Sequence, residues 1–294
     1  MRIRRTTVTV ALLTTFALTA CGGSGTDAGT DVPVADKPSF AAGSTMATIS
    51  AAGKLRVGTK FDQPGFGLKG LSGEPEGFDV EVAKIIAGAL GLKADAIEFT
   101  ESPSKVREEL IEQGKVDLVA ATYTINDKRK ERISFAGPYY VAGQQLMVAS
   151  DNAKIMGPED LKANPDVKVC SVTGSTPAEQ IKEYLASDSQ LVLFDVYDKC
   201  RFALRTDQVG VVTTDNVILL GLVSKSDGQF KLVGEQFTEE PYGIGVKKGD
   251  VAFCEFINTA LKDNPEAYTK AWAETAGKVE GAKAPTLPAA AACS

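Results

Sequence analysis

The chain has 294 residues, of which 44% are hydrophobic and 24% are charged, with a formal net charge of −6 and no histidine. This composition is typical of a soluble globular protein, and it excludes a disordered chain or a multi-span membrane protein. The acidic excess excludes a surface built to hold a nucleic-acid backbone. Without histidine, the chain has no Ser-His-Asp or Cys-His catalysis and no histidine-ligated metal. We therefore expect small-molecule binding, with no cofactor, no metal ion and no nucleic-acid partner.

Residues 1–20 have the charged-then-apolar order of a secretory signal peptide. Three arginines precede an uncharged stretch at 6–20 that is too short to span a bilayer comfortably. The stretch runs into Leu-Thr-Ala-Cys-Gly at 18–22, which resembles the lipobox of bacterial lipoproteins, where the cysteine receives a lipid. The alternative is ordinary signal cleavage that leaves Cys21 free. We expect a lipid anchor at Cys21 that holds the protein on the outer face of the cell membrane.

The segment at 21–47 is predicted to be a flexible tether. It is rich in Gly, Ser, Thr, Ala and Asp with scattered Pro, and such a composition does not bury enough apolar surface to fold.

Four cysteines remain after Cys21, an even number that favours disulfides in an exported chain. We expect Cys254 to pair with Cys293, because the Ala/Pro tail that contains Cys293 would be loose unless it were pinned to the helix that contains Cys254. Cys170 then pairs with Cys200. The alternative is four unpaired buried thiols.

From residue 54 onward, short apolar strands alternate with amphipathic helices, which predicts α/β layering with largely parallel sheets. Roughly 230 residues of folded chain exceed what one typical core needs, so two lobes are expected. Polar residues gather where strands end, the edge at which α/β sheets bind ligands. Strands are predicted at 55–58, 97–99, 116–121, 144–149, 167–172, 191–194, 209–213 and 242–246, and helices at 79–90, 106–113, 177–185, 197–204, 216–222, 251–262 and 265–276.

Several motifs follow one another along this pattern: GFDVEVA at 77–83, TYTINDKR at 122–129, FAGPYY at 135–140, GSTP at 174–177 and TD at 214–215. In this order they resemble the amino-acid-binding proteins of bacterial ABC importers, the solute-binding proteins of family 3. The resemblance covers residues 54–276. Two further runs, GTKFDQPG at 58–65 and ESPS at 101–104, look like the glutamate-binding lipoproteins of that family.

The resemblance implies a two-lobed fold of the periplasmic-binding-protein type (type II). Each lobe would be a mainly parallel sheet flanked by helices, and two hinge strands would join the lobes. Lobe 1 would comprise residues 48–141 and 242–294, and lobe 2 residues 142–241. The implied protein is a monomer, not an enzyme, that captures an amino acid outside the cytoplasm and delivers it to the permease subunits of an ABC importer.

Recognition of the α-carboxylate is expected at Arg129, whose planar guanidinium makes bidentate bonds to a carboxylate. Thr122 and Thr124 would add donors beside it. The alternative for Arg129 is a solvated charge among neighbouring basic residues.

Two further groups are expected to hold the amino-acid backbone. Ser175 and Thr176 lie at a predicted helix start with Pro177 at its first position, where backbone N–H groups attract a carboxylate, and their alternative role is N-capping alone. The resemblance makes Asp215 the partner of the α-ammonium, although Asp215 could also be only a helix cap. Tyr197 is either a contact for the ligand side chain or a core aromatic.

Specificity is expected from Lys60, Ser104 and Arg107, which match positions used by binders of acidic amino acids. If Lys60, Arg107 and Arg129 face the cleft against Asp215, the site holds three cations and one anion, a poor host for a neutral ligand. Glutamate would balance most of this charge, followed by aspartate and glutamine.

Two other functions fit the same fold. One is an exported enzyme such as a dehydratase of cyclic acids, with Asp215 and Glu101 as the available carboxylates. Because an ammonium partner would lower the pKa of Asp215 and make it a poor acid, this function ranks second. The other is a sensor subunit that reports amino-acid levels to a membrane kinase and differs only in its partner.

Overall fold

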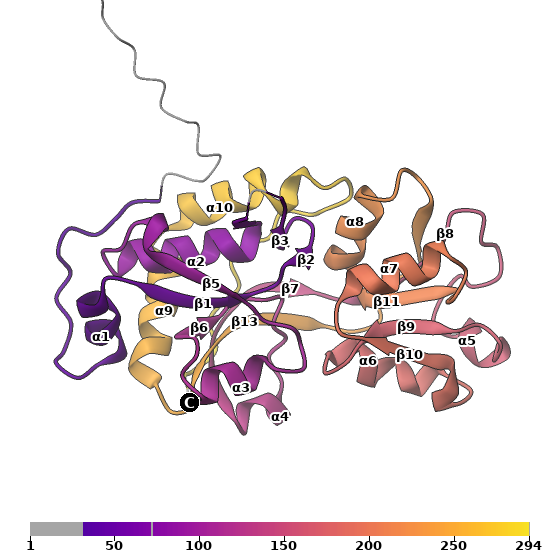
Figure 1. The fold of residues 1–294 in the computed structure, drawn as a ribbon, viewed down its shortest axis with the longest axis horizontal. Helices are drawn as coiled ribbons and strands as arrows, with labels where there is room; N and C mark the ends of the chain where they lie inside the picture. The colour runs from indigo at the N-terminus through magenta and orange to yellow at the C-terminus, as the bar shows by residue number, and fades with distance from the viewer. Residues whose placement is uncertain (1–31, 72, 294) are drawn as a thin grey trace, which may run out of the picture.

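Two α/β lobes lie side by side in the computed structural model, which describes residues 32–71 and 73–293 (Figure 1). The predicted signal peptide, the lipid attachment at Cys21 and the first part of the predicted tether lie outside these residues. No helix among the described residues is long and apolar enough to cross a membrane.

Lobe 1 is built on a five-stranded sheet with the order β5-β1-β6-β13-β7. Strand β1 runs parallel to β5 and β6, whereas β13 runs antiparallel to β6 and β7. A smaller sheet of β2, β3 and β4 lies beside the border with lobe 2. The strands of lobe 1 are β1 (Leu55–Thr59), β2 (Asp62–Gln63), β3 (Gly67–Lys69), β4 (Pro75–Glu76), β5 (Ile97–Glu101), β6 (Leu118–Val119), β7 (Ile133–Ala142) and β13 (Glu240–Lys247). Its helices are α1 (Thr45–Ala52), α2 (Phe78–Ala89), η1 (Ala94–Ala96), α3 (Arg107–Glu112), α4 (Asp127–Lys130), α9 (Val251–Asp263), α10 (Pro265–Glu274) and η4 (Ala276–Lys278).

Lobe 2 is built on a second five-stranded sheet, with the order β10-β9-β11-β8-β12. Strands β10, β9 and β11 are parallel, and β8 runs antiparallel to β11 and β12. The strands of lobe 2 are β8 (Gln144–Ala149), β9 (Val169–Val172), β10 (Leu191–Phe194), β11 (Val211–Asp215) and β12 (Phe230–Val233). Its helices are α5 (Asp160–Ala163), α6 (Thr176–Gln180), η2 (Ile181–Tyr184), η3 (Asp188–Gln190), α7 (Tyr197–Arg205) and α8 (Asn216–Ser224).

The predicted two-lobed α/β fold is confirmed. Its sheets, predicted to be mainly parallel, are mixed. The chain leaves lobe 1 through β7 and returns through β13, so the two strands run in opposite directions and pair as neighbours, with Glu240 opposite Ala142. This antiparallel pair forms the connection between the lobes.

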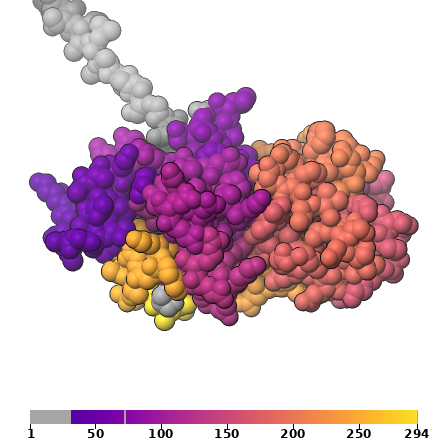
Figure 2. All heavy atoms as spheres, turned by 60° about the horizontal axis from the view of Figure 1, so that its bottom comes forward, coloured from indigo at the N-terminus to yellow at the C-terminus, as the bar shows by residue number. Residues whose placement is uncertain are grey.

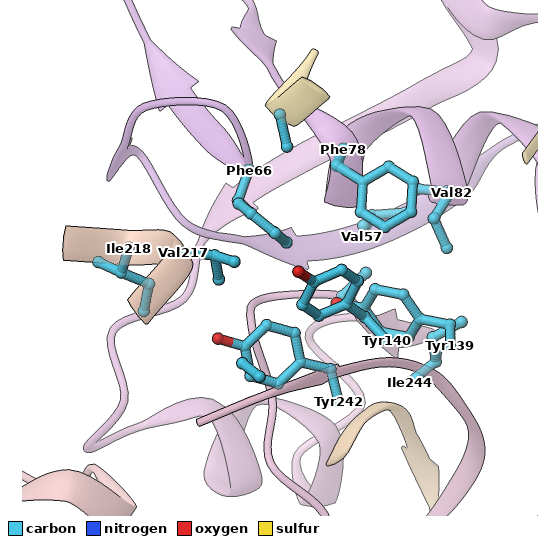
Figure 3. Close-up of a cluster of buried hydrophobic side chains, with 14 of the residues drawn as sticks. Val57, Phe66, Phe78, Val82, Tyr139, Tyr140, Val217, Ile218, Tyr242 and Ile244 are labelled. Atoms are coloured by element: carbon cyan, nitrogen blue, oxygen red, sulfur yellow. The ribbon is translucent and has the colours of Figure 1, made fainter. Parts of the chain in front are cut away.

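An aromatic cluster secures the hinge strands to the helices of lobe 1. Tyr140 of β7 stacks on Trp272 of α10, with ring centroids 5.2 Å apart. Phe66 meets Tyr140 and Tyr242 edge-on, a favoured ring geometry. Val217, from α8 of lobe 2, belongs to the same cluster and lies at its edge, on the side of Phe66 and Tyr242 (Figure 3). Apolar contact therefore continues from one lobe to the other.

Residues 32–47 differ from the predicted tether, because they pack on lobe 1. Ala35 donates a backbone hydrogen bond of 2.9 Å to Gly88, and the ring of Phe40 meets that of Phe256 edge-on at 5.6 Å. The composition of this segment is polar overall, but its few apolar side chains pack against α2 and α9. The sequence-based tether prediction is wrong for this part of the chain.

Both predicted disulfides are present, Cys170–Cys200 and Cys254–Cys293. The first joins β9 to α7 within lobe 2, and the second joins α9 to the C-terminal tail. Ala291 of the tail also donates a 2.8 Å hydrogen bond to the carbonyl of Gly137. The tail therefore ends against lobe 1 (Figure 1).

Candidate ligand-binding site

A small polar cavity lies between the lobes. On the face drawn in Figure 2, magenta side chains of lobe 1 meet orange side chains of lobe 2 along the border. The cavity is lined from lobe 1 by Gln63, Ser104, Arg107, Thr122 and Thr124, and from lobe 2 by Ser175, Thr176, Pro177, Tyr197, Thr214, Asp215 and Ile218.

The lining contains most of the residues predicted from sequence, namely Ser104, Arg107, Thr122, Thr124, Ser175, Thr176, Tyr197 and Asp215. The other two, Lys60 and Arg129, are buried directly behind it. The ammonium of Lys60 donates to Ser104 Oγ at 2.9 Å, and Arg129 Nη1 donates to the carbonyl of Thr124 at 2.6 Å. All ten residues are therefore brought together, while their roles toward a ligand stay proposals.

Asp215 presents a carboxylate oxygen to the cavity. It sits before the first residue of α8 without a side-chain capping bond, so the cap-only alternative does not describe it. Tyr242 donates a 2.6 Å hydrogen bond to Oδ2, whereas Oδ1 has no hydrogen-bond partner among the described residues. Burial, with the nearby charge of Glu240 as the second cause, raises the pKa of Asp215 to about 8. A cation placed at Oδ1 would favour the ionised form.

Arg129 is 6% exposed, which excludes the alternative of a solvated surface charge. Its Nε lies 3.3 Å from the carboxylate of Glu108, and its Nη2 donates across the lobe border to the carbonyl of Gly174 at 3.1 Å. Burial lowers the pKa of Arg129 to about 10, so the side chain stays charged at neutral pH.

The start of α6 meets both lobes. Ser175 caps the helix, since its Oγ accepts from the backbone N–H of Ala178 at 3.1 Å. Thr176 Oγ1 donates to Glu240 Oε2 at 2.8 Å and lies 3.3 Å from Thr124 Oγ1. The capping role of Ser175 is therefore observed, and it leaves a further role toward a ligand possible.

Lys60, Ser104 and Arg107 form one group on the wall of lobe 1. The guanidinium of Arg107 lies 3.9 Å from the centroid of the Tyr123 ring, and its Nη1 donates to the carbonyl of Ala121 at 3.0 Å. Burial, with the charge of Arg107 as the second cause, lowers the pKa of Lys60 to about 7. A second negative charge beside Lys60 would restore its protonated form.

The sequence-based charge count was incomplete, because three buried carboxylates near the site were missed. Asp79 accepts from the backbone N–H of Thr122 at 2.8 Å, Glu108 contacts Arg129, and Glu240 accepts from the hydroxyl of Thr176. With Asp215, these acids outnumber the three cations. The balance of three cations against one anion is therefore wrong, and formal charge alone does not select a dicarboxylate.

Asp79 also has a structural role at the cavity wall. Thr122 has φ of 44°, the left-handed region that non-glycine residues rarely adopt. The carboxylate of Asp79 accepts the Thr122 N–H and the Tyr139 hydroxyl, which holds this turn in place. The motif at 77–83 marked Asp79 without revealing this role.

Gln63 is a lining residue that the sequence analysis did not single out. Its Oε1 accepts from the hydroxyl of Thr122 at 2.9 Å, whereas its Nε2 has no partner among the described residues. The signal available was its place in the run at 58–65, directly after Asp62. Nothing in the sequence marked Glu240, a single acid in an apolar strand.

The chain was compared with known proteins. The family model described as bacterial extracellular solute-binding proteins, family 3, matches residues 55–272. The glutamate-binding protein GluB of Corynebacterium efficiens is 38% identical over 261 residues, which cover 86% of this chain and 82% of GluB. The ABC transporter glutamine-binding protein GlnH of Bacillus subtilis is 38% identical over 257 residues, which cover 86% of this chain and 90% of GlnH.

Among solved structures, the chain is similar to the ancestral amino acid-binding protein AncCDT-1, a precursor of cyclohexadienyl dehydratase. The two share 32% identity with a TM-score of 0.71, over 79% of this chain and 99% of AncCDT-1. GluB, GlnH and AncCDT-1 are all named as binding proteins, and AncCDT-1 is described as the precursor of an enzyme.

Proposed function

Because the chain belongs to the bacterial extracellular solute-binding proteins of family 3, we propose that it captures L-glutamate and delivers it to the permease of an ABC importer. Aspartate and glutamine rank behind glutamate. The names of the relatives GluB and GlnH support an amino acid of this group as the ligand.

One observation carries the choice of glutamate: three side chains on the wall of lobe 1 offer donors. Ser104 Oγ already accepts from Lys60, so its own proton is available to donate. Gln63 Oε1 is occupied by Thr122, which leaves the Nε2 donor. Arg107 carries only donors, and its Nε has no partner among the described residues. A carboxylate satisfies such donors with both oxygens, whereas the amide of glutamine would leave its own NH₂ group unmatched.

The opposite wall supports the amino-acid class. Asp215 Oδ1, in lobe 2, is a carboxylate oxygen without a partner in the described part of the chain, and it is suited to an α-ammonium. Arg129 lies on the lobe 1 side with bonds to Thr124 and to Gly174, where its fork would bind the α-carboxylate. Ligand contacts from both lobes would favour the closed state over the open one.

The proposal includes an anchor on the outer face of the cell membrane. Cys21 would carry the lipid after removal of residues 1–20, and the segment before residue 32 would link it to lobe 1. The motif at 18–22 supports this part. Mass spectrometry of the membrane fraction tests it: a diacylglyceryl group on Cys21 supports the anchor, and an unmodified Cys21 contradicts it.

A thermal-unfolding screen tests the ligand. The chain is purified, unfolded, refolded with its disulfides oxidised to remove carried-over ligand, and heated with each of the twenty common amino acids. A ligand at a hundred times its Kd stabilises the folded state by about 2.7 kcal/mol. Glutamate should give the largest shift in Tm, and a larger shift with a basic amino acid would contradict the proposal.

A dehydratase is the second candidate, because Asp215 with its pKa raised to about 8 resembles a general acid. The likeness to AncCDT-1 favours it at the level of the fold. An activity assay separates the two functions: the protein is incubated with a carboxylic acid that contains a cyclohexadienol ring, and the absorbance of the aromatic dehydration product is recorded. Turnover that disappears in Asp215→Asn would establish the enzyme.

A further inference from the structure

Asp62 of lobe 1 forms a hydrogen bond with the first turn of a helix in lobe 2. Its Oδ2 accepts from the backbone N–H of Tyr197, the first residue of α7, at 2.7 Å. Val196, the residue at the capping position of α7, makes no side-chain capping bond. The carboxylate that caps this helix therefore comes from the opposite lobe.

The surrounding contacts show that this bond depends on closure. Asp62 and Tyr197 are 135 residues apart and belong to separate lobes, so hinge opening would separate them. Next to this pair, Gly221 of α8 lies so near the carbonyl of Pro64 that an added Cβ would be 2.4 Å from the oxygen. The edge of lobe 1 around β2 thus lies directly against α7 and α8.

Asp62 itself does not line the cavity, although its neighbour Gln63 and its partner Tyr197 do. Its contribution is therefore separate from ligand recognition. We propose that Asp62 is a positioning residue for closure: its carboxylate caps α7 across the lobe border and stabilises the closed state equally for every ligand.

A competing explanation is that Asp62 acts through Lys60, whose charge it supports electrostatically. The two explanations differ in specificity. Loss of the cap would lower the affinity for every ligand by the same factor, whereas loss of support for the charge of Lys60 would lower the affinity for glutamate more than that for glutamine. They also differ in the response to asparagine, which caps helices about as well as aspartate but has no charge.

The test measures the dissociation constants and rate constants of glutamate and glutamine for wild type, Asp62→Ala and Asp62→Asn. Asp62→Ala should lower the affinity for both ligands by the same factor, about 3- to 10-fold, mainly through faster dissociation. Asp62→Asn should keep most of the affinity. Asp198→Ala is the matched control, because Asp198 is an acid in the first turn of the same helix whose partner, Arg201, lies in the same lobe. Asp198→Ala should change the dissociation constant of neither glutamate nor glutamine.

A loss confined to glutamate, or no loss in Asp62→Ala, would overturn the proposal. The proposal rests on the binding function, so a second measurement is needed that does not depend on the ligand's identity. Hydrogen exchange of the Tyr197 amide is followed with a mixture of the twenty amino acids. Faster exchange in Asp62→Ala but not in Asp198→Ala supports the cap even if glutamate proves to be the wrong ligand, and equal exchange in all three proteins contradicts it.

Discussion

The hydroxyl of Tyr242, on the strand that returns the chain to lobe 1, donates a 2.6 Å hydrogen bond to Asp215 Oδ2 in lobe 2. The bond fixes one oxygen of the carboxylate and leaves Oδ1 without a partner among the described residues. Both residues are buried. An acid in this position is costly to ionise until a cation reaches it. In the proposed function, Asp215 would therefore link the proton equilibrium of the site to ligand binding.

The stability of the ligand-free protein should therefore depend on pH through Asp215. Its pKa rises from the ordinary value of 3.8 to about 8 in the folded state, so the folded state binds this proton more tightly. The resulting stabilisation is fully present below pH 4 and is lost as pH rises toward 8. Asp215→Asn lacks this loss. The free energy of unfolding of Asp215→Asn minus that of wild type should rise by up to ~1.4 kcal/mol for each pH unit between pH 5 and 7.5.

Urea unfolding of both proteins at several pH values measures this difference. Asp79, whose pKa is also raised by burial, to about 7, is present in both proteins, so its contribution largely cancels. A difference that stays constant with pH would show that Asp215 is ionised throughout.

Arg129→Lys should weaken every amino acid by about 100-fold or more, because an ammonium keeps the charge but not the two-pronged donor geometry. Lysine leaves a cation beside Glu108, which Arg129 contacts at 3.3 Å, so the variant tests the fork without creating an unpaired buried carboxylate. Isothermal titration with glutamate and glutamine measures the loss. Unchanged affinity would remove Arg129 from the α-carboxylate site.

Arg107→Ala should weaken glutamate binding about 10-fold more than glutamine binding, because it removes a bond that joins two opposite charges only when the ligand presents a carboxylate. The exposed Lys105 provides the control, since Lys105→Ala removes a cation from the same segment without changing the cavity lining. Equal losses for the two ligands in Arg107→Ala would exclude it from specificity.

The disulfide of the tail should stabilise lobe 1. Cys254 and Cys293 are 39 residues apart, and a loop of this length contributes about 3 to 4 kcal/mol on the chain-entropy model. The double variant Cys254→Ser/Cys293→Ser should lower Tm while glutamate affinity stays within about 2-fold, because the tail does not line the cavity. A large loss of affinity at a temperature where the variant is folded would contradict this separation.

The sequence predicted the parts of the fold that have a clear period or a specific residue order. Helix α9 (Val251–Asp263) and strand β11 (Val211–Asp215) lie close to their predicted ranges, because long periodic segments carry the strongest local signal. The cysteine pairs also followed from position. Strands β2, β3 and β4 were not predicted, since runs of two or three residues contain no measurable alternation.

The site was predicted unevenly for a related reason. Arg129 and Asp215 stood in motifs, whereas Glu240 lies in a strand whose sequence gives no sign that a carboxylate there is buried. The hydrogen-bond donor to its carboxylate is Thr176, which lies 64 residues away in the chain. Buried partners of this kind arise from tertiary contacts, so the error in the charge count followed from reasoning without them.

The central claim is that lobe 1 presents donors to a second carboxylate. Isothermal titration of the refolded, ligand-free chain with glutamate and glutamine tests it most directly. We predict 1:1 binding of both, with glutamate tighter by about 10- to 100-fold, as expected for one charge-assisted bond. Equal affinity, or tighter binding of glutamine, would contradict the claim.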